Sequence, residues 1–194
     1  MLPVTEAESI ILELVEPIQD TETVNLELAS DRVLATPVTS QLDFPHWDNS
    51  AMDGYAVCHK DLINCDRDRP KILEIVEEIP AGYVPKIKLR SGQTARIFTG
   101  AMMPKGADSV VIQENTQKQG DRVTIFSSPQ LHEFVRFKGS FYQAGTIMLQ
   151  SGIAIGAADL AVLATAQCTK FNVYRRPRVA IFSTGDELVT PEQP

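Results

Sequence analysis

Three short polar segments of the chain carry residue types that could bind an anion or a metal ion. The first segment, residues 49–57, presents Asp53 in a small-residue turn before a strand-like run. Ser50 can exchange hydrogen bonds with the backbone of such a turn, and Gly54 tolerates the positive φ that tight turns often need. Asp53 is therefore the first candidate for a catalytic carboxylate or a metal ligand, although an Asp-Gly pair is also common as a plain turn cap.

The second segment, residues 99–108, lies between two apolar runs and begins with Thr99 and Gly100. A threonine hydroxyl beside a glycine, followed by backbone N–H groups, suits an oxyanion or a phosphate. The same strand, loop and strand pattern also fits an ordinary hairpin-like connection.

The third segment, residues 183–188, follows an apolar run at 178–182 and contains Asp186 and Glu187. A strand-like run that enters a polar turn is typical of the start of an α/β domain. The two acidic residues could also be an ordinary pair at the N-terminus of a helix, where they interact with its dipole.

Composition limits the classes of protein to which the chain can belong. It has 194 residues, of which 43% are hydrophobic and 22% charged, and a formal net charge of −7. These fractions are ordinary for a globular protein, and the negative charge disfavours nucleic-acid and anionic-membrane partners. No window approaches the ~20 apolar residues of a membrane span, and the N-terminus lacks a secretory leader. We expect a cytoplasmic protein whose three cysteines are reduced thiols.

The sequence around the candidates indicates the elements that position them. The chain begins with an amphipathic helical pattern. Thr5 is its predicted N-cap, and Glu8 is the predicted partner of Thr5 in a capping box. Pro17 should end or bend that helix. An extended piece at 24–28 and a second helix at 29–34 should follow, and a later helix is expected at 157–166.

Between these helical pieces, short apolar runs alternate with Gly, Pro, Asp and Asn, which is typical of a small mostly-β domain. Candidate strands cover residues 54–58, 72–77, 94–98, 109–113, 122–126 and 133–136. We therefore predict an α+β chain in which a β-rich domain, residues 37–145, is inserted between residues 1–36 and 146–177. Residues 178–194 should be the truncated start of an α/β domain, because a parallel strand needs a crossover and a partner strand that do not follow.

Together, the three polar segments resemble the molybdopterin molybdotransferase family, which includes MoeA and the gephyrin E-domain. The resemblance rests on SAMDGYAV at 50–57, RIFTGAMMPKGADSVV at 96–111 with Glu114 after it, and STGDEL at 183–188. It implies an elongated, discontinuous first domain that mediates much of a homodimer contact, with a β-rich second domain inserted in it. It also implies that further domains carry most of the pterin-binding surface.

The resemblance further implies a reaction. Members of the family insert molybdenum from molybdate into the dithiolene of adenylylated molybdopterin, release AMP and use a divalent cation such as Mg²⁺. Magnesium prefers one or two carboxylates together with phosphate oxygens and water. Asp53 would ligate or orient the metal, Thr99 with the Gly100 backbone would hold an oxyanion, and Glu187 would be the carboxylate of the third motif. The further substrate-binding candidates of these motifs are Ser50, Gly100 and Asp186.

A fourth segment resembles the family's Arg-x-x-Gly-Glu-Asp loop but departs from it. Arg136 and Lys138 precede Gly139 and are candidate substrate-binding residues, whereas Ser140 and Phe141 stand where the family places Glu and Asp. Either another residue supplies the missing carboxylate, or molybdate insertion is weakened in this protein.

Several of these residues could also have purely structural roles. Thr99 could be a satisfied turn hydroxyl, and Glu114 a surface residue at a strand end. His46 and Trp47 could stack on a ligand, although aromatic residues near a turn more commonly pack. The whole chain could also be a dimerisation and scaffold module without catalytic activity, since the gephyrin branch of the family is a scaffold too, or a shortened homologue with a regulatory role.

Overall fold

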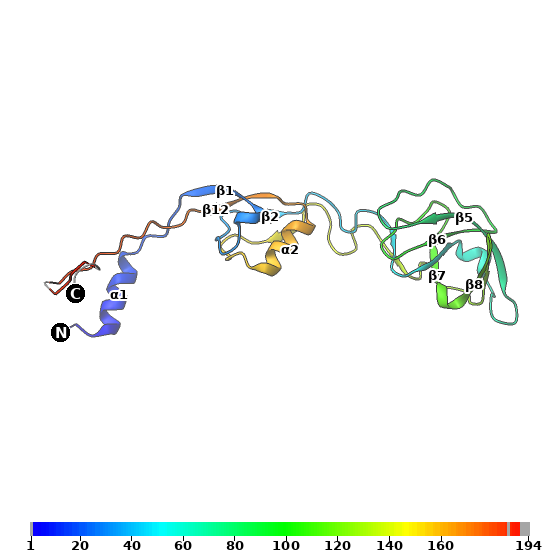
Figure 1. Cartoon of the computed structure of the whole chain (residues 1–194), viewed down its shortest axis with the longest axis horizontal. Coiled ribbons are helices and arrows are strands. Elements are labelled where there is room, and N and C mark those ends of the chain that lie inside the picture. Colours follow the sequence, from blue (N-terminus) through cyan, green and yellow to red (C-terminus); the bar gives the residue numbers. More distant parts are fainter. Residues whose placement is uncertain (1, 186, 191–194) are drawn as a thin grey trace. The chain divides into compact units, whose positions relative to one another are not determined.

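Two separate stretches of the sequence fold together, and the stretch between them folds by itself. The computed structural model describes residues 2–185 and 187–190 and contains both helices and sheets. One compact unit comprises Met1–Val38 with Ile147–Pro194, and the other comprises Thr39–Thr146 (Figure 1). The roles predicted for the parts, dimerisation for 1–36 with 146–177 and the start of an α/β domain for 178–194, stay predictions.

Helix α1, Val4–Leu14, begins one residue before the predicted cap and has no capping box. Pro3 is its N-cap, and the Ala7 N–H donates to the Pro3 carbonyl, which closes the first turn. Thr5 therefore lies inside the helix, where its carbonyl accepts the Ser9 hydroxyl. The helix ends before Pro17, because the backbone is already extended at Val15. None of its residues is buried.

The remainder of the first unit is built on an antiparallel pair of strands, β1 (Thr21–Asn25) and β12 (Lys170–Tyr174). Strand β2 (Val38–Thr39) pairs with β11 (Ile147–Leu149), and helix α2 (Ala157–Thr165) packs against the same core. The core is apolar and includes Val24, Leu34, Ile155, Leu163, Phe171 and Val173. Figure 1 shows α2 beside the two paired strands.

The predicted helix at 29–34 is wrong, whereas the helix at 157–166 is confirmed with its end one residue earlier. A single 3₁₀ turn, η1 (Leu26–Leu28), follows β1, and Asp31 then takes a left-handed backbone with φ of 59°. A left-handed residue ends a right-handed helix. Val33 and Leu34 instead form isolated bridges to Ala154 and Val173. Strand β12, the partner of β1, was not predicted.

The second unit contains a six-stranded sheet in the order β7-β4-β6-β5-β9-β8. Its strands are β4 (Gly54–Val57), β5 (Lys71–Ile79), β6 (Gln93–Ile97), β7 (Ser109–Ile112), β8 (Thr116–Gln119) and β9 (Arg122–Ile125). Both faces are covered. Tyr55 and Val57 belong to one buried cluster, whereas Ala56, between them, belongs to another. The 3₁₀ turns η2 (His59–Leu62) and η3 (Gln113–Asn115) follow β4 and β7.

Most predicted strands of this unit are confirmed within a few residues, but one is shorter than predicted and other strands were not predicted. The run at 133–136 forms only the two-residue strand β10 (Val135–Arg136), which pairs with β3 (Asn49–Ser50). Left-handed backbones at His132 and Phe134 prevent a longer strand there. Strand β8 was missed because its residues are mostly exposed and polar, which removes the alternating pattern.

The apolar run at 178–182 forms no strand in the part of the chain that is described. Its apolar residues Val179, Ile181 and Phe182 are highly exposed. A strand requires a hydrogen-bonding partner, and no described residue pairs with this run. Across the described residues, moreover, no helix has the length and apolar character needed to cross a membrane.

Candidate functional site

The pairing of strands β4 and β6 brings two of the polar segments together. Gly54, the first residue of β4, lies opposite Ile97, the last residue of β6, because the strands are antiparallel. Asp53 precedes Gly54, and Thr99 comes two residues after Ile97. Because one strand starts where its neighbour ends, Asp53 and Thr99 lie at the same end of this strand pair.

Asp53 and Thr99 are joined by two hydrogen bonds to one carboxylate oxygen. Asp53 Oδ1 accepts the Thr99 backbone N–H at 2.7 Å and the Thr99 hydroxyl at 2.8 Å. Both bonds favour the charged carboxylate, so they lower the pKa of Asp53, and the Arg96 charge lowers it further. Within the described residues, Asp53 Oδ2 has no hydrogen-bond partner. The bonds to Oδ1 thus keep the Asp53 carboxylate ionised, and Oδ2 is available to bind a ligand or a metal ion.

The hydroxyl bond gives a test of this arrangement. In Thr99→Val the backbone bond remains and the hydroxyl bond is lost, so the pKa of Asp53 should rise part of the way toward its ordinary value. A depressed folded-state pKa contributes stability above the unfolded pKa and loses it as pH falls through the folded value. The variant should therefore lose that contribution at a higher pH than the parent chain.

The measurement is a ¹³C NMR titration of the Asp53 carboxyl carbon. Thr124→Val, in strand β9 of the same unit, is the matched control and should leave the Asp53 titration unchanged. An Asp53 midpoint that does not move in Thr99→Val would show that the hydroxyl bond is absent in solution.

The backbone around Gly100 is already engaged, which corrects the expected oxyanion site. The Gly100 N–H donates to the Ser50 carbonyl at 2.8 Å, and the Ser50 N–H donates to the Ala101 carbonyl. Gly100 has a φ of +83°, a left-handed backbone that glycine adopts without strain. The Thr99 hydroxyl is bonded to Asp53, as is its N–H, so the groups expected to hold an oxyanion instead connect the two polar loops.

Ser50 was predicted to bind substrate, but it is fully buried. Its hydroxyl donates to the Met52 carbonyl at 2.6 Å and accepts the Met52 N–H at 3.3 Å. These local bonds form the turn that leads into Asp53. In this structure, Ser50 therefore shapes the turn and does not reach a ligand.

Arg96 is a component of the site that the sequence reading missed. Its guanidinium lies over the rings of Tyr55 and Phe98, at 5.2 and 4.9 Å from their centroids. It donates to the Gly54 carbonyl at 3.2 Å and to Gln113 Oε1 at 2.7 Å. The Gln113 backbone N–H in turn donates to the Asp53 carbonyl.

These contacts make Arg96 a positioning residue for Asp53, since it holds the backbone that follows the carboxylate, directly at Gly54 and through Gln113 at the Asp53 carbonyl. One signal in the sequence could have revealed it. Arg96 and Phe98 stand two residues apart in a strand-like run, so their side chains share a face, and a cation there needs a partner.

Gly54 owes its importance to close packing and not to a positive φ, contrary to expectation. It lies within β4, between β6 and β7. A Cβ atom added at this position would lie 2.0 Å from the Val111 carbonyl oxygen. Only glycine allows the two strands to approach this closely.

A pocket of about 250 Å³ in the second unit reaches Gly100, the neighbour of Thr99 in the sequence. We call it the aromatic pocket, and its lining residues are Phe44, Pro45, His46, Trp47, Asn49, Gly100, Arg136 and Phe141. Arg136 and Asn49 lie opposite each other across strands β10 and β3. Residues on opposite positions of an antiparallel pair have neighbouring side chains. Arg136, a predicted substrate-binding residue, thus borders this pocket.

Lys138 and the loop that departs from the family pattern lie next to the aromatic pocket. The Lys138 ammonium pairs with Asp43 Oδ2 at 3.3 Å, and its backbone N–H donates to Asp48 Oδ1 at 2.8 Å. The Ala144 N–H and this lysine lower the pKa of Asp43. Phe141 packs on Phe44, with ring centroids 5.7 Å apart. Lys138 is therefore engaged in holding the loop, and an aromatic ring occupies the place of the missing carboxylate.

Of the three remaining predicted residues, the structure describes Glu114 and Glu187. Glu114 is exposed in η3. Glu187 is exposed and belongs to the first unit, whereas Asp53 and Thr99 belong to the second. Asp186 lies outside the described residues.

Metal binding by protein groups alone has no support within the described part of the chain. No group of three or more His, Cys, Asp or Glu side chains gathers there in a metal-binding arrangement. Magnesium, however, commonly takes one or two carboxylates and completes its shell with water and substrate phosphates. Asp53, with Oδ2 available, fits that more limited requirement.

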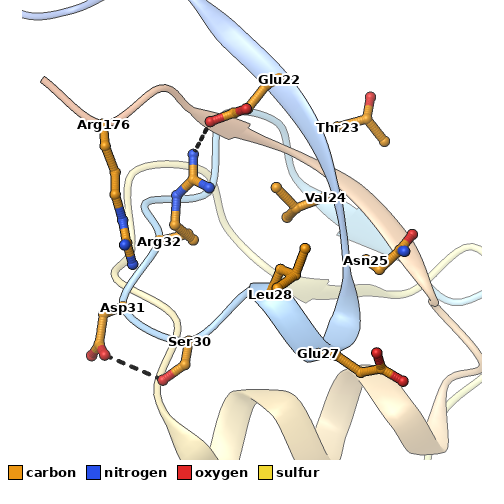
Figure 2. A pocket seen from close by; sticks show the side chains of 10 residues that line it. All are labelled: Glu22, Thr23, Val24, Asn25, Glu27, Leu28, Ser30, Asp31, Arg32 and Arg176. Atoms are coloured by element: carbon orange, nitrogen blue, oxygen red, sulfur yellow. Dashed lines mark hydrogen bonds and ion pairs between the residues drawn. The ribbon is translucent and has the colours of Figure 1, made fainter. Parts of the chain in front are cut away.

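A larger pocket, of about 590 Å³, belongs to the first unit and contains none of the predicted site residues. Figure 2 shows Arg32 paired with Glu22 inside it, and Arg176 beside Arg32. Arg32 also donates to the Tyr174 carbonyl. Acidic residues, among them Glu27 and Asp31, share the lining with the two arginines. This mixed charge gives the pocket no clear preference for an anion or a cation.

Comparisons with known proteins agree with the motifs. Residues 2–166 match the family model described as the MoeA N-terminal region, domains I and II. A protein of Nostoc sp. named molybdopterin molybdenumtransferase is 56% identical over 197 residues, which cover 100% of this chain and 45% of the relative. A Haemophilus influenzae protein of the same name is 34% identical, with coverages of 100% and 47%.

A solved structure shows the same fold. The molybdopterin biosynthesis moeA protein of Pyrococcus horikoshii superposes with a TM-score of 0.82 at 32% identity. The match covers 91% of this chain and 47% of the solved one. The chain thus spans about half the length of the curated relatives that it matches.

Proposed function

Because the chain belongs to the MoeA N-terminal-region family, we propose that it serves the insertion of molybdenum from molybdate into adenylylated molybdopterin, with release of AMP. The observation that supports this proposal most is the Asp53–Thr99 pair, an ionised carboxylate with one oxygen available at one end of the β4–β6 strand pair. Relatives that carry the name molybdopterin molybdenumtransferase cover the whole chain. Because it corresponds to half of their length, we propose that it contributes one part of the catalytic site.

In this proposal, Asp53 Oδ2 is a ligand of Mg²⁺ or of a water bound to it. When bound, Mg²⁺ would neutralise the charge of phosphate and molybdate oxygens held close together. Thr99 keeps the carboxylate ionised and oriented, and Arg96 fixes the backbone around it. Arg136 supplies positive charge at the aromatic pocket. Glu187 and Asp186 are proposed to contribute further carboxylates to the reaction.

We also propose that the protein is cytoplasmic and forms a homodimer through its first unit. Helix α1 supports the dimer, since its apolar residues Val4, Ile11, Leu12 and Leu14 are all more than half exposed. The exposed apolar residues of helix α1 also support the second candidate function, a dimerisation and scaffold module without activity. Light scattering distinguishes a monomer from a dimer. A monomer at micromolar concentration would contradict both the dimer and the scaffold function.

The experiment for the activity measures AMP release from adenylylated molybdopterin with Mg²⁺ and molybdate. The purified chain is compared with the intact Nostoc relative as the positive control. We expect release by the relative and none by the chain alone, because the chain corresponds to 45% of the relative. Release by the chain alone would show that the Asp53–Thr99 site suffices. A dimer that releases no AMP even when joined to the remaining length of the relative would favour the scaffold function.

Phe141 provides a prediction about the missing carboxylate. If its replacement of Asp weakens molybdate insertion, Phe141→Asp should raise turnover at saturating substrate several-fold in a protein that has the remaining length. Ser140→Glu is the companion variant, since Ser140 stands where the family has Glu. An unchanged turnover in both variants would show that another group already supplies the carboxylate.

A further inference from the structure

The aromatic pocket is lined by a continuous series of rings. Phe141 lies 5.7 Å from Phe44, Phe44 lies 5.8 Å from His46, and His46 lies 5.7 Å from Trp47, measured between ring centroids. Trp47 is 39% exposed and Phe141 is 65% exposed, so both present ring surface to solvent. Exposed aromatic faces that border a pocket are stacking surfaces for flat ligands.

The size and charge of the pocket narrow the class of ligand. Pockets for drug-sized molecules occupy about 300–1,000 Å³. The volume here, about 250 Å³, suits one ring system and not a whole nucleotide-like substrate. Arg136 is the one Lys, Arg, Asp or Glu side chain among the lining residues. Without a carboxylate in the lining, the pocket does not suit a metal ion, whereas a flat ring with acceptor atoms on its edge fits it.

Polar groups on one wall suit the edge of a nitrogen heterocycle. No described residue forms an ion pair with Arg136, and guanidinium groups bind the adjacent oxygen and nitrogen acceptors of guanine-type rings. Asn49, opposite Arg136, is 7% exposed, and its Oδ1 has no hydrogen-bond partner among the described residues. A buried acceptor without a hydrogen-bond partner destabilises the fold. An amino group on a bound ring could donate to Asn49 Oδ1 after the Asn49 side chain rotates toward the pocket.

We propose that the aromatic pocket holds a planar nitrogen heterocycle of the substrate, a pterin or a purine, with Phe141 as one wall. The inference rests on the proposed function and specifies how that substrate is held. Gly100 lines the pocket and follows Thr99, the partner of Asp53. A phosphate-bearing substituent on that ring would need the proposed Mg²⁺ between it and the Asp53 carboxylate, since both groups are anionic. Phe141 thereby has a binding role that the family's carboxylate would not provide.

The chain contains one tryptophan, and it lines this pocket, so its fluorescence reports on occupancy. The purified chain is titrated separately with 6-hydroxymethylpterin, AMP and ribose 5-phosphate, and absorbance by the probes is corrected with free N-acetyltryptophanamide. We expect saturable quenching by a ring-bearing probe and none by ribose 5-phosphate. Quenching by the pterin alone identifies a pterin subsite, and quenching by AMP alone identifies a purine subsite.

Two variants and a control test the wall directly. Phe141→Ala and Phe141→Asp should weaken probe binding about tenfold, since stacking on one aromatic side chain has roughly that worth. Tyr83→Ala removes a side chain of similar exposure, 64%, far along the sequence from the pocket, and should bind as the parent chain does. Circular dichroism verifies that each variant is folded.

No saturable quenching by either ring, or equal affinity in the parent chain and the Phe141 variants, would overturn the inference. Quenching by ribose 5-phosphate would also overturn it, because the pocket would then recognise the phosphate. The proposed function has a separate test. Molybdate-dependent AMP release by a chimera of this chain with the remaining length of the Nostoc relative, together with absent ring binding in this pocket, would refute the inference and leave the function standing.

Discussion

Replacing Asp53 with asparagine is expected to lower molybdate-dependent AMP release by about 10²–10³-fold. The assay uses a chimera in which this chain replaces the aligned region of the Nostoc relative. Asparagine keeps the shape of the side chain, and its carbonyl oxygen can still accept both bonds from Thr99. The loss is therefore one of charge, at the oxygen proposed to face Mg²⁺ and the substrate oxygens.

Asp61→Asn is the matched control for this variant. Asp61 also accepts a backbone N–H and a hydroxyl, from Gly92 and Ser91, in the same unit. It accepts the same two kinds of donor as Asp53, although one on each carboxylate oxygen, and it has no place in the proposed site. AMP release should stay within about twofold of the parent chimera, since surface substitutions of this kind have small effects. An Asp53→Asn chimera that keeps more than half of the parent activity would remove Asp53 from the catalytic machinery.

The second large effect concerns stability, and it follows from Gly54. Gly54→Ala would place a methyl group 2.0 Å from the Val111 carbonyl oxygen and 3.0 Å from the Ile112 Cα. Those atoms are backbone of strand β7, so they cannot move aside without breaking the β4–β7 pairing. The free energy of unfolding of the second unit should fall by about 3 kcal/mol or more.

Urea unfolding followed by Trp47 fluorescence measures this loss, because the one tryptophan lies in the second unit. Gly120→Asn is the control in the same unit, since a Cβ there meets nothing within 4 Å and asparagine tolerates the left-handed backbone at this position. Its cost should stay below about 1 kcal/mol. A Gly54→Ala chain with the parent midpoint would show that β4 and β7 are not packed this closely.

The sequence predicted the strands of the second unit better than the elements of the first. Strands β4, β6 and β7 are short, apolar and bounded by turn residues, so pattern alone located them. The helix expected at 29–34 was wrong, because Asp31 adopts a left-handed backbone that apolar periodicity does not reveal. The pairing of β1 with β12 joins residues some 150 positions apart, and no local pattern carries that information.

For the site, motifs identified Asp53 and Thr99, but only the strand register explains why they meet. The backbone N–H groups expected to bind an oxyanion turned out to connect the two loops. Arg96 was not predicted because its one signal, a position two residues before Phe98 in a strand-like run, is weak on its own. Phe141 was recognised as a departure from the family pattern, whereas its packing on Phe44 beside a pocket required the structure.

The most direct test of the proposed function is AMP release by the unmutated chimera. Its molybdate and Mg²⁺ dependence is measured beside the intact Nostoc relative, with circular dichroism and light scattering to verify that the chimera is folded. We predict release that requires both molybdate and Mg²⁺, at a rate within about tenfold of the relative, a difference of ~1.4 kcal/mol in activation free energy. A folded chimera that binds adenylylated molybdopterin but releases no AMP would contradict a catalytic role for this chain.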